Sequence, residues 1–133
     1  MPSFWTSQSD RLLSLLRVIT GLLFLEHGTM KMLNFPPSEM FGGGPPESFT
    51  MIWFAGVLEL VGGVLIALGL FTRPVAFILS GQMAFAYFIA HAPQSPYPTL
   101  NGGESAILFC FVFLYFSAAG GGALSLDRVL KRA

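Results

Sequence analysis

The stretch MIWFAGVLELVGGVLIALGLF, residues 51–71, decides the fold class because it carries a single charged side chain, Glu59. A helix needs roughly 20 largely apolar residues to cross the hydrocarbon layer of a membrane, where every backbone N–H group must be satisfied within the helix. The stretch PVAFILSGQMAFAYFIA, residues 74–90, follows almost directly and carries no charge. These two stretches predict membrane-spanning helices at about residues 50–71 and 74–91.

Two further stretches flank this pair, at about residues 12–33 and 103–120. The first is less apolar, because its uninterrupted apolar core covers only residues 18–25. No small-x-small cleavage site follows that core, so we expect a retained helix rather than a signal peptide. The sequence therefore predicts an all-α integral membrane protein, an antiparallel bundle of four transmembrane helices in a single domain, residues 1–133.

The composition points the same way. Hydrophobic residues make up 53% of the chain and charged residues 11%, and the mean hydropathy is +0.67, whereas a soluble domain needs a charged surface. The composition also excludes a disordered chain and a coiled coil. Seven Lys and Arg balance seven Asp and Glu without a dense basic cluster, which excludes nucleic acid as a partner. The single cysteine, Cys110, excludes an internal disulfide and a cysteine-based zinc site.

The connecting segments and the basic residues predict the orientation of the bundle. Residues 34–49 and 92–102 are rich in Pro and Gly, which favour loops, and residues 72–74 predict a tight turn. Only Lys31 falls on the loop side of the predicted bundle. The basic residues on the opposite side are Arg11, Arg17, Arg73, Arg128, Lys131 and Arg132. The positive-inside rule then places both termini in the cytoplasm and both long loops outside.

Ionisable residues concentrate in the half of the predicted bundle that faces outward. Because successive spans run in opposite directions, the helical rise places Glu26, His27 and Glu59 inside the outer half of the membrane. The same reasoning places His91 and Glu104 near the outer boundary. Ionisable residues are rare within membrane spans and mark functional sites by default. The sequence therefore predicts a shared polar site in the outer half of the bundle.

Glu59 allows both a functional and a structural interpretation. It shares a helical face with Gly56 and Gly63, and small residues let a neighbouring helix approach closely. This spacing predicts that the carboxyl group points into the bundle rather than toward lipid. There it serves either a function or a structural hydrogen bond.

Lys31, His91 and Glu104 also have ordinary structural explanations. Lys31 lies one turn after His27, so a carboxylate, either Glu59 or Glu104, could separate their like charges. Alternatively, Lys31 extends to the outer headgroups. Glu104 opens a helix, where the helix dipole alone favours a carboxylate, and His91 closes one.

No cofactor motif accompanies these residues. Two histidines with carboxylates are a possible metal or haem set, but their spacing is not diagnostic. The glycine runs fall in loops without a preceding strand, which disfavours a P-loop or a dinucleotide site. We therefore expect no intrinsic flavin, haem or metal site, and electrons for any redox reaction would come from a partner.

Four short runs together resemble the DoxX family. They are LLRVITGLLFLEHGTMK (15–31), LELVGGVLIALGLFTR (58–73), NGGESAILF (101–109) and SLD (125–127). The resemblance covers nearly the whole chain in order and implies a multi-pass protein of the bacterial inner membrane. Family relatives are associated with a quinone-reducing thiosulfate oxidoreductase, with oxidative-stress complexes and with resistance to catechols and quinones. More distant members include membrane chaperones and cargo receptors. Glu26 stands where the family motif more often has a small or apolar residue.

Two functional hypotheses follow. In the first, the chain is a membrane subunit that binds a quinone or a similar lipophilic redox molecule, with protons handled by His and Glu side chains. The candidate catalytic residues are His27 and Glu59, and the candidate ligand-binding residues are Glu26, Lys31, His91 and Glu104. In the second, the chain is a non-enzymatic assembly factor, chaperone or small-molecule carrier whose Pro-rich loop docks a client. A transporter is a third option, and a protein partner or a homo-oligomer is expected in each case.

Overall fold

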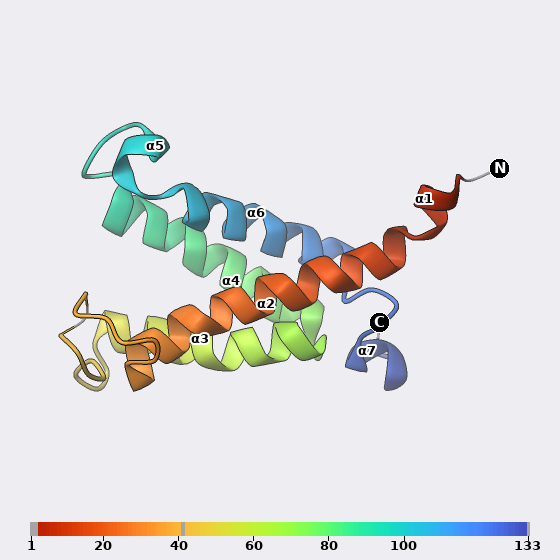
Figure 1. Ribbon diagram of the computed structural model, residues 1–133, viewed down its shortest axis with the longest axis horizontal. Helices are drawn as coiled ribbons and strands as arrows, with labels where there is room; N and C mark the ends of the chain where they lie inside the picture. The colour runs from red at the N-terminus through yellow and green to blue at the C-terminus, as the bar shows by residue number, and fades with distance from the viewer. Residues whose placement is uncertain (1–2, 41, 133) are drawn as a thin grey trace.

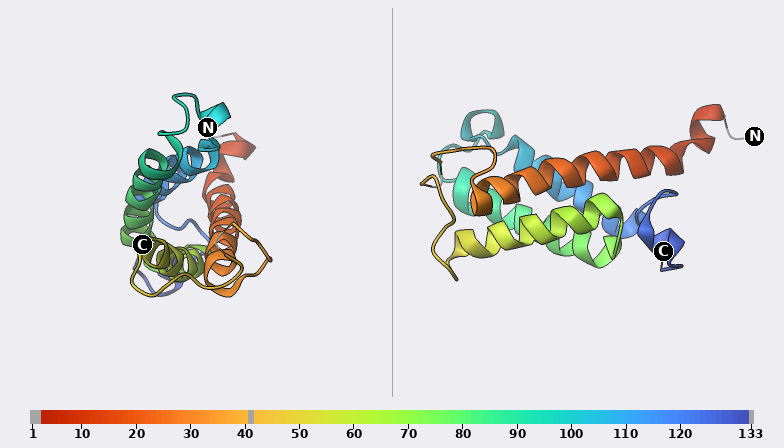
Figure 2. Two further views of the ribbon diagram at one scale, coloured as in Figure 1. Left: turned by 90° about the vertical axis from the view of Figure 1, so that its left-hand side faces the viewer. Right: turned by 60° about the horizontal axis from the view of Figure 1, so that its bottom comes forward.

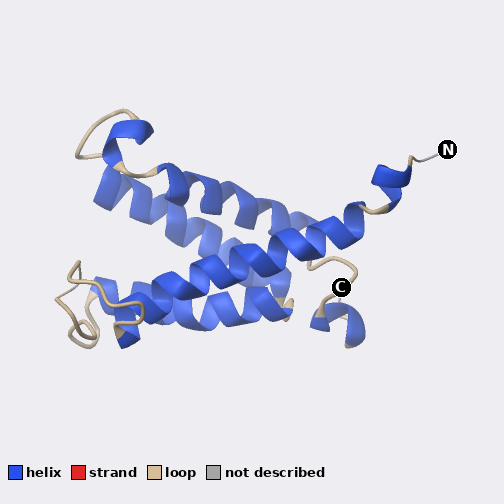
Figure 3. Ribbon diagram, in the orientation of Figure 1, coloured by secondary structure: helices blue, strands red, loops and turns tan. Residues whose placement is uncertain are grey.

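The structure, a computed structural model, describes residues 3–40 and 42–132. Residue 41 of the predicted outer loop and residues 1, 2 and 133 of the predicted domain lie outside the described residues. Every regular element in the described part is helical, and no strand occurs there (Figures 1 and 3). The elements are α1 (Phe4–Ser7), α2 (Ser9–Leu33), α3 (Met51–Leu68), α4 (Thr72–Ala86), the π-helical turn η1 (Tyr87–His91), α5 (Pro98–Asn101), α6 (Glu104–Ala119) and α7 (Leu126–Val129).

Three of the predicted spans are confirmed as helices long and apolar enough to cross a membrane. They are α2, α3 and the continuous helix formed by α4 and η1, Thr72–His91. The fourth apolar helix, α6, has only 16 residues. The predicted tight turn at residues 72–74 is wrong, because these residues form the first turn of α4. The chain instead reverses at Gly69 and Phe71, which both have a positive φ.

The long helices pair two by two. α2 lies along α3, α4 lies along α6, and α3 and α4 meet less extensively (Figure 2). Both termini lie at one end of the molecule and both long loops at the other, which we call the terminal end and the loop end (Figure 1). The buried apolar core comprises Phe24, Ile66, Ala76, Leu79, Met83, Ala106, Phe113 and Phe116. Many large apolar side chains are exposed on the outside of the helices, as a lipid-facing surface requires.

Glycines bring the backbones of α2 and α3 into direct contact. A Cβ atom placed on Gly63 would lie 2.7 Å from Cα of Leu25, and one on Gly28 would lie 2.5 Å from the backbone nitrogen of Leu60. Gly56 meets the side chain of Met32 on the same face. The glycine face predicted around Glu59 is therefore confirmed, and it packs against α2.

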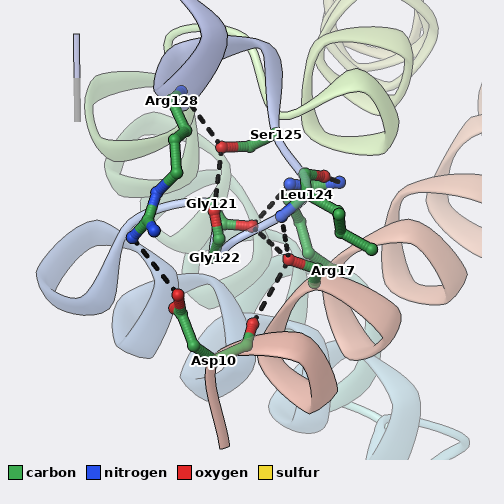
Figure 4. Close-up of polar contacts among 8 residues, drawn as sticks. Asp10, Arg17, Gly121, Gly122, Leu124, Ser125 and Arg128 are labelled. Carbon is green, nitrogen blue, oxygen red and sulfur yellow. Dashed lines mark hydrogen bonds and ion pairs between the residues drawn. The ribbon is translucent and has the colours of Figure 1, made fainter. Parts of the chain in front are cut away.

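The C-terminal segment, residues 120–132, folds back onto the terminal end and is held by Arg17. This side chain of α2 is buried, and its guanidinium donates hydrogen bonds to the backbone carbonyls of Gly121 and Leu124 (Figure 4). It also donates to the carbonyl of Ala67 on α3. The hydroxyl of Ser14, one turn earlier, accepts a hydrogen bond from Leu124 N–H at 2.9 Å. Arg17 thus satisfies carbonyls that would otherwise be buried without a donor.

Asp127 fastens the same segment to the start of α4. Its carboxylate accepts hydrogen bonds from the backbone N–H groups of Phe71 and Thr72 at 2.8 and 2.9 Å. These N–H groups have no partner within the helix, because the first turn of a helix leaves its donors unsatisfied. Asp127 therefore acts as a helix cap supplied from a distant part of the chain.

Replacing Asp127 by alanine is expected to lower the free energy of unfolding by about 2 kcal/mol, since a buried and a partly buried N–H donor lose a charged acceptor. Thermal unfolding of the purified protein in detergent measures the loss. Asp10→Ala is the matched control, because its ion pair with Arg128, 3.2 Å long, is exposed and should contribute less than about 1 kcal/mol. Equal losses in the two variants would contradict the capping role.

Candidate functional site

A buried ion pair joins α2 to α3 in the half of the molecule toward the loop end. The ammonium group of Lys31 lies 2.6 and 2.7 Å from the two carboxylate oxygens of Glu59. Only 14% of the Lys31 side chain and 4% of the Glu59 side chain are exposed. Of the two interpretations of Lys31, the structure supports the pair with Glu59 over extension to the headgroups.

A groove of about 380 Å³ runs between α2 and α6. Its lining is mainly apolar, with a few polar groups among the apolar side chains. The lining residues are Thr20, Leu23, Glu26, His27, Ser105, Leu108, Phe109 and Val112. This mixture is typical of sites that bind small apolar molecules and orient them through a few polar contacts.

His27 connects the groove with the ion pair. Its ring lines the groove and meets Phe109 of α6 edge-on, with 6.0 Å between the ring centroids and a 90° angle between the planes. Lys31 stands one helical turn later on α2 and pairs with Glu59. The structure therefore brings His27, Lys31 and Glu59 into one neighbourhood, while only His27 among them lines the groove.

Glu26 and Glu104 are exposed, and each takes a different place relative to the groove. Glu26 lines the groove together with His27. Adjacent residues of a helix point about 100° apart, so the groove spans both directions. Glu104 is the first residue of α6, as the sequence predicts, and stands next to the lining residue Ser105. Glu104 itself is not part of the lining.

His91 belongs to a hydrogen-bond network that shapes the loop before α6. Its Nδ1 lies 3.0 Å from the backbone oxygen of Asn101, and its ring stacks on Tyr87. The buried amide of Asn101 donates to the Tyr87 hydroxyl and to the carbonyl of Ser95, and its oxygen accepts from Gly103 N–H. The five ionisable groups predicted to share one site therefore take different places. Glu26 and His27 line the groove, and Glu59 pairs with Lys31. Glu104 opens α6 beside Ser105, and His91 belongs to the loop network.

Sequence reasoning missed several residues that build these sites. Phe109 and Val112 line the groove with Ser105, and their spacing of four and three residues on one helix could have indicated a common face. Asn101 stands before a Gly-Gly pair, a pattern typical of turns whose side-chain amide bonds to the backbone. No local pattern indicates that Arg17 and Asp127 hold the C-terminal segment.

In residues 3–40 and 42–132, no group of three or more His, Cys, Asp or Glu side chains is arranged to hold a metal ion. The single cysteine, Cys110, accepts through its backbone oxygen a hydrogen bond of 2.7 Å from the Ser80 hydroxyl, which joins α6 to α4. The groove presents hydrogen-bonding groups of Thr20, Glu26, His27 and Ser105.

Comparison with known proteins places the chain among bacterial membrane proteins. It is 48% identical over 119 residues to an "Uncharacterized protein" of Haemophilus influenzae, covering 87% of this chain and 88% of that one. It is 29% identical to the "Putative oxidoreductase CatD" of Bacillus subtilis (85% and 82% covered) and 28% identical to the "Inner membrane protein YphA" of Escherichia coli (88% and 89% covered). No solved structure matches. The sequence model of the DoxX family matches residues 12–92, more than half of the chain, and the protein is therefore a member of the DoxX family.

Proposed function

We propose that this DoxX protein is a membrane subunit that binds a quinone or a similar lipophilic redox molecule in the α2–α6 groove. The observation that carries the proposal is the groove itself, which combines an apolar lining with His27 and the aromatic ring of Phe109. Its volume of about 380 Å³ falls in the range of small-molecule sites. The Bacillus subtilis relative is named "Putative oxidoreductase CatD", which agrees with this class of activity.

The proposal includes a four-span topology in one domain, with both termini in the cytoplasm of a bacterium. At about 1.5 Å per residue, the 16 residues of α6 reach about 24 Å, somewhat less than the hydrocarbon thickness of about 30 Å. The flanking residues and local thinning of the bilayer can make up the difference. The excess of Arg at the terminal end supports a cytoplasmic location for that end.

In this site, His27 donates or accepts a hydrogen bond at a ring oxygen of the ligand and exchanges a proton with it. Glu26 and the hydroxyl groups of Thr20 and Ser105 provide further polar contacts along the groove. The Lys31–Glu59 pair, one helical turn beyond His27 on α2, is the group to which His27 passes a proton. Electrons come from a partner protein, because reduction of the ligand requires a donor.

Glu104 and His91 take outer positions in this proposal. Glu104 lies at the rim, one residue before Ser105. His91 keeps the loop before α6 in place through Asn101, and so supports the end of the groove that α6 contributes. Replacing His91 should therefore affect ligand binding less than replacing His27.

The binding test uses the purified protein and a short-chain benzoquinone, with titration calorimetry in detergent. His27→Ala and Leu108→Trp should each raise the dissociation constant about tenfold, which corresponds to about 1.4 kcal/mol for a lost hydrogen bond or a filled groove. Phe111→Trp is the control, because Phe111 is an exposed residue of the same helix that does not line the groove.

Two outcomes of this titration would contradict the proposal. One is a wild-type protein that binds no quinone, and the other is an equal loss of affinity in the Phe111→Trp control. If a protein partner also co-purifies while quinone never binds, the assembly-factor or carrier function is the better description of this chain.

A further inference from the structure

A second pocket, of about 260 Å³, lies at the terminal end and shares no lining residue with the α2–α6 groove. It is formed where α4 begins and where the chain leaves α6 toward the C-terminal segment. The lining residues that matter here are Thr72, Arg73, Gly120, Gly121, Asp127 and Arg132. The pocket therefore draws on two parts of the chain that are distant in sequence, the start of α4 and the C-terminal segment.

The charge balance of this pocket is positive. Arg73 and Arg132 contribute two guanidinium groups against the single carboxylate of Asp127, and that carboxylate is already engaged by the N–H groups of Phe71 and Thr72. Guanidinium groups bind phosphoryl oxygens through paired N–H donors and carry their charge at any physiological pH. The excess charge thus favours an anion.

Both guanidinium groups keep donors available. Arg73 donates from Nη1 to the carbonyl of Ala118, and Arg132 stands over the ring of Phe71 with its Cζ atom 4.7 Å from the ring centroid. Within residues 3–40 and 42–132, no further side-chain hydrogen bond of either arginine occurs. Their remaining N–H groups can therefore serve a ligand.

The hydroxyl of Thr72 supplies an independent sign of a ligand. The side chain lines the pocket and is fully buried, yet Oγ1 has no hydrogen-bond partner in the described part of the chain. Buried hydroxyl groups are almost always paired, because leaving one unpaired is costly. An acceptor bound in the pocket would complete this hydrogen bond.

Two glycines pack closely against the polar groups of the pocket lining. A Cβ atom on Gly121 would lie 2.8 Å from Cβ of Ser125 and 3.0 Å from Oγ1 of Thr72, and one on Gly120 would lie 3.2 Å from Nη2 of Arg73. Gly120 also has a φ of 82°, which other residues rarely adopt. A larger residue at either glycine would therefore crowd the Thr72 hydroxyl or the Arg73 guanidinium.

We propose that this pocket binds a phosphoryl group, with Arg73 and Arg132 pairing its charged oxygens and the Thr72 hydroxyl donating to one of them. The group comes from the headgroup of an anionic phospholipid or from free phosphate. Both sources present charged oxygens on a tetrahedral phosphorus. The site is independent of the redox function proposed for the groove.

The test measures binding of phosphatidylglycerol to the full chain by native mass spectrometry from a gentle detergent, with phosphatidylcholine for comparison. Arg73→Gln/Arg132→Gln should weaken phosphatidylglycerol binding at least tenfold, and Thr72→Val should weaken it several-fold. Arg11→Gln/Lys131→Gln is the control, since it removes the same charge at the terminal end but outside the pocket. This control should bind as the wild type does.

The single variant Arg132→Gln keeps the test decisive if the double variant unfolds. Within the described residues, the side chain of Arg132 contacts only the exposed ring of Phe71, so its loss should leave the fold intact. A second arm adds inorganic phosphate at millimolar concentration. If inorganic phosphate displaces phosphatidylglycerol, free phosphate is a ligand of the pocket. If phosphate does not displace the lipid, the ligand is the lipid headgroup. Equal losses in the pocket and control variants, or binding of neither probe, would overturn the proposal.

Discussion

Gly63→Leu is expected to prevent stable packing of α2 on α3 and to give the largest loss of stability among the substitutions considered. A Cβ atom at this position would lie 2.7 Å from Cα of Leu25, and the obstacle is backbone that cannot rotate away. The helices would have to separate, which would also pull Lys31 from Glu59. We expect a loss of several kcal/mol, as in other severe overpacking, measured by thermal unfolding in detergent.

Gly81→Leu provides the matched control for this variant. Gly81 also lies inside a long helix, α4, but a Cβ atom there would meet nothing within 4 Å. The change should be neutral or slightly stabilising, because leucine has a higher helix propensity than glycine. If both variants unfold at the same temperature, the close approach of α2 and α3 does not hold the protein together.

Glu59→Leu is expected to cost about 3 to 5 kcal/mol, because it removes one partner of a buried ion pair and leaves the Lys31 charge within the bundle. Lys31→Leu/Glu59→Leu should recover part of that loss, since replacing both charges by apolar groups avoids the uncompensated charge. The coupling energy follows from unfolding the wild type, both single variants and the double variant.

The same set of variants separates the two interpretations of Glu59. If the carboxylate only joins the helices, the double variant should keep the quinone affinity measured for the wild type. If it relays protons for a ligand in the groove, the double variant should fold but fail to support quinone turnover with a partner. A coupling energy as small as that of the exposed Asp10–Arg128 pair, below about 1 kcal/mol, would contradict the structural role.

Local sequence patterns were sufficient to predict much of the helical architecture. The uncharged or nearly uncharged stretches predicted helices that the structure confirms, and Pro and Gly located the two long loops. The spacing of Gly56, Glu59 and Gly63 predicted a face turned to a neighbouring helix, which proved to be α2. These successes share one cause: each depends on residues within a few positions of each other.

Contacts between segments that are distant in sequence could not be predicted without the folded structure. Depth in the membrane alone predicted that His91 and Glu104 share the level of His27. Depth does not fix rotation about a helix axis, and the ring of His91 contacts the backbone oxygen of Asn101. The start of α4 was placed two residues late because its cap, Asp127, lies more than fifty positions away in sequence.

The amino-acid sequence by itself determined that this chain forms apolar helices, where they are interrupted and which face of α3 is small enough for close contact. The tertiary structure decided which charges meet, which residues of α2 and α6 border a groove, and that Arg17 holds the C-terminal segment. The physical reason is that helix formation follows from short-range periodicity. Pairing of side chains depends instead on the rotation and crossing of whole helices, which only the packing of all of them together fixes.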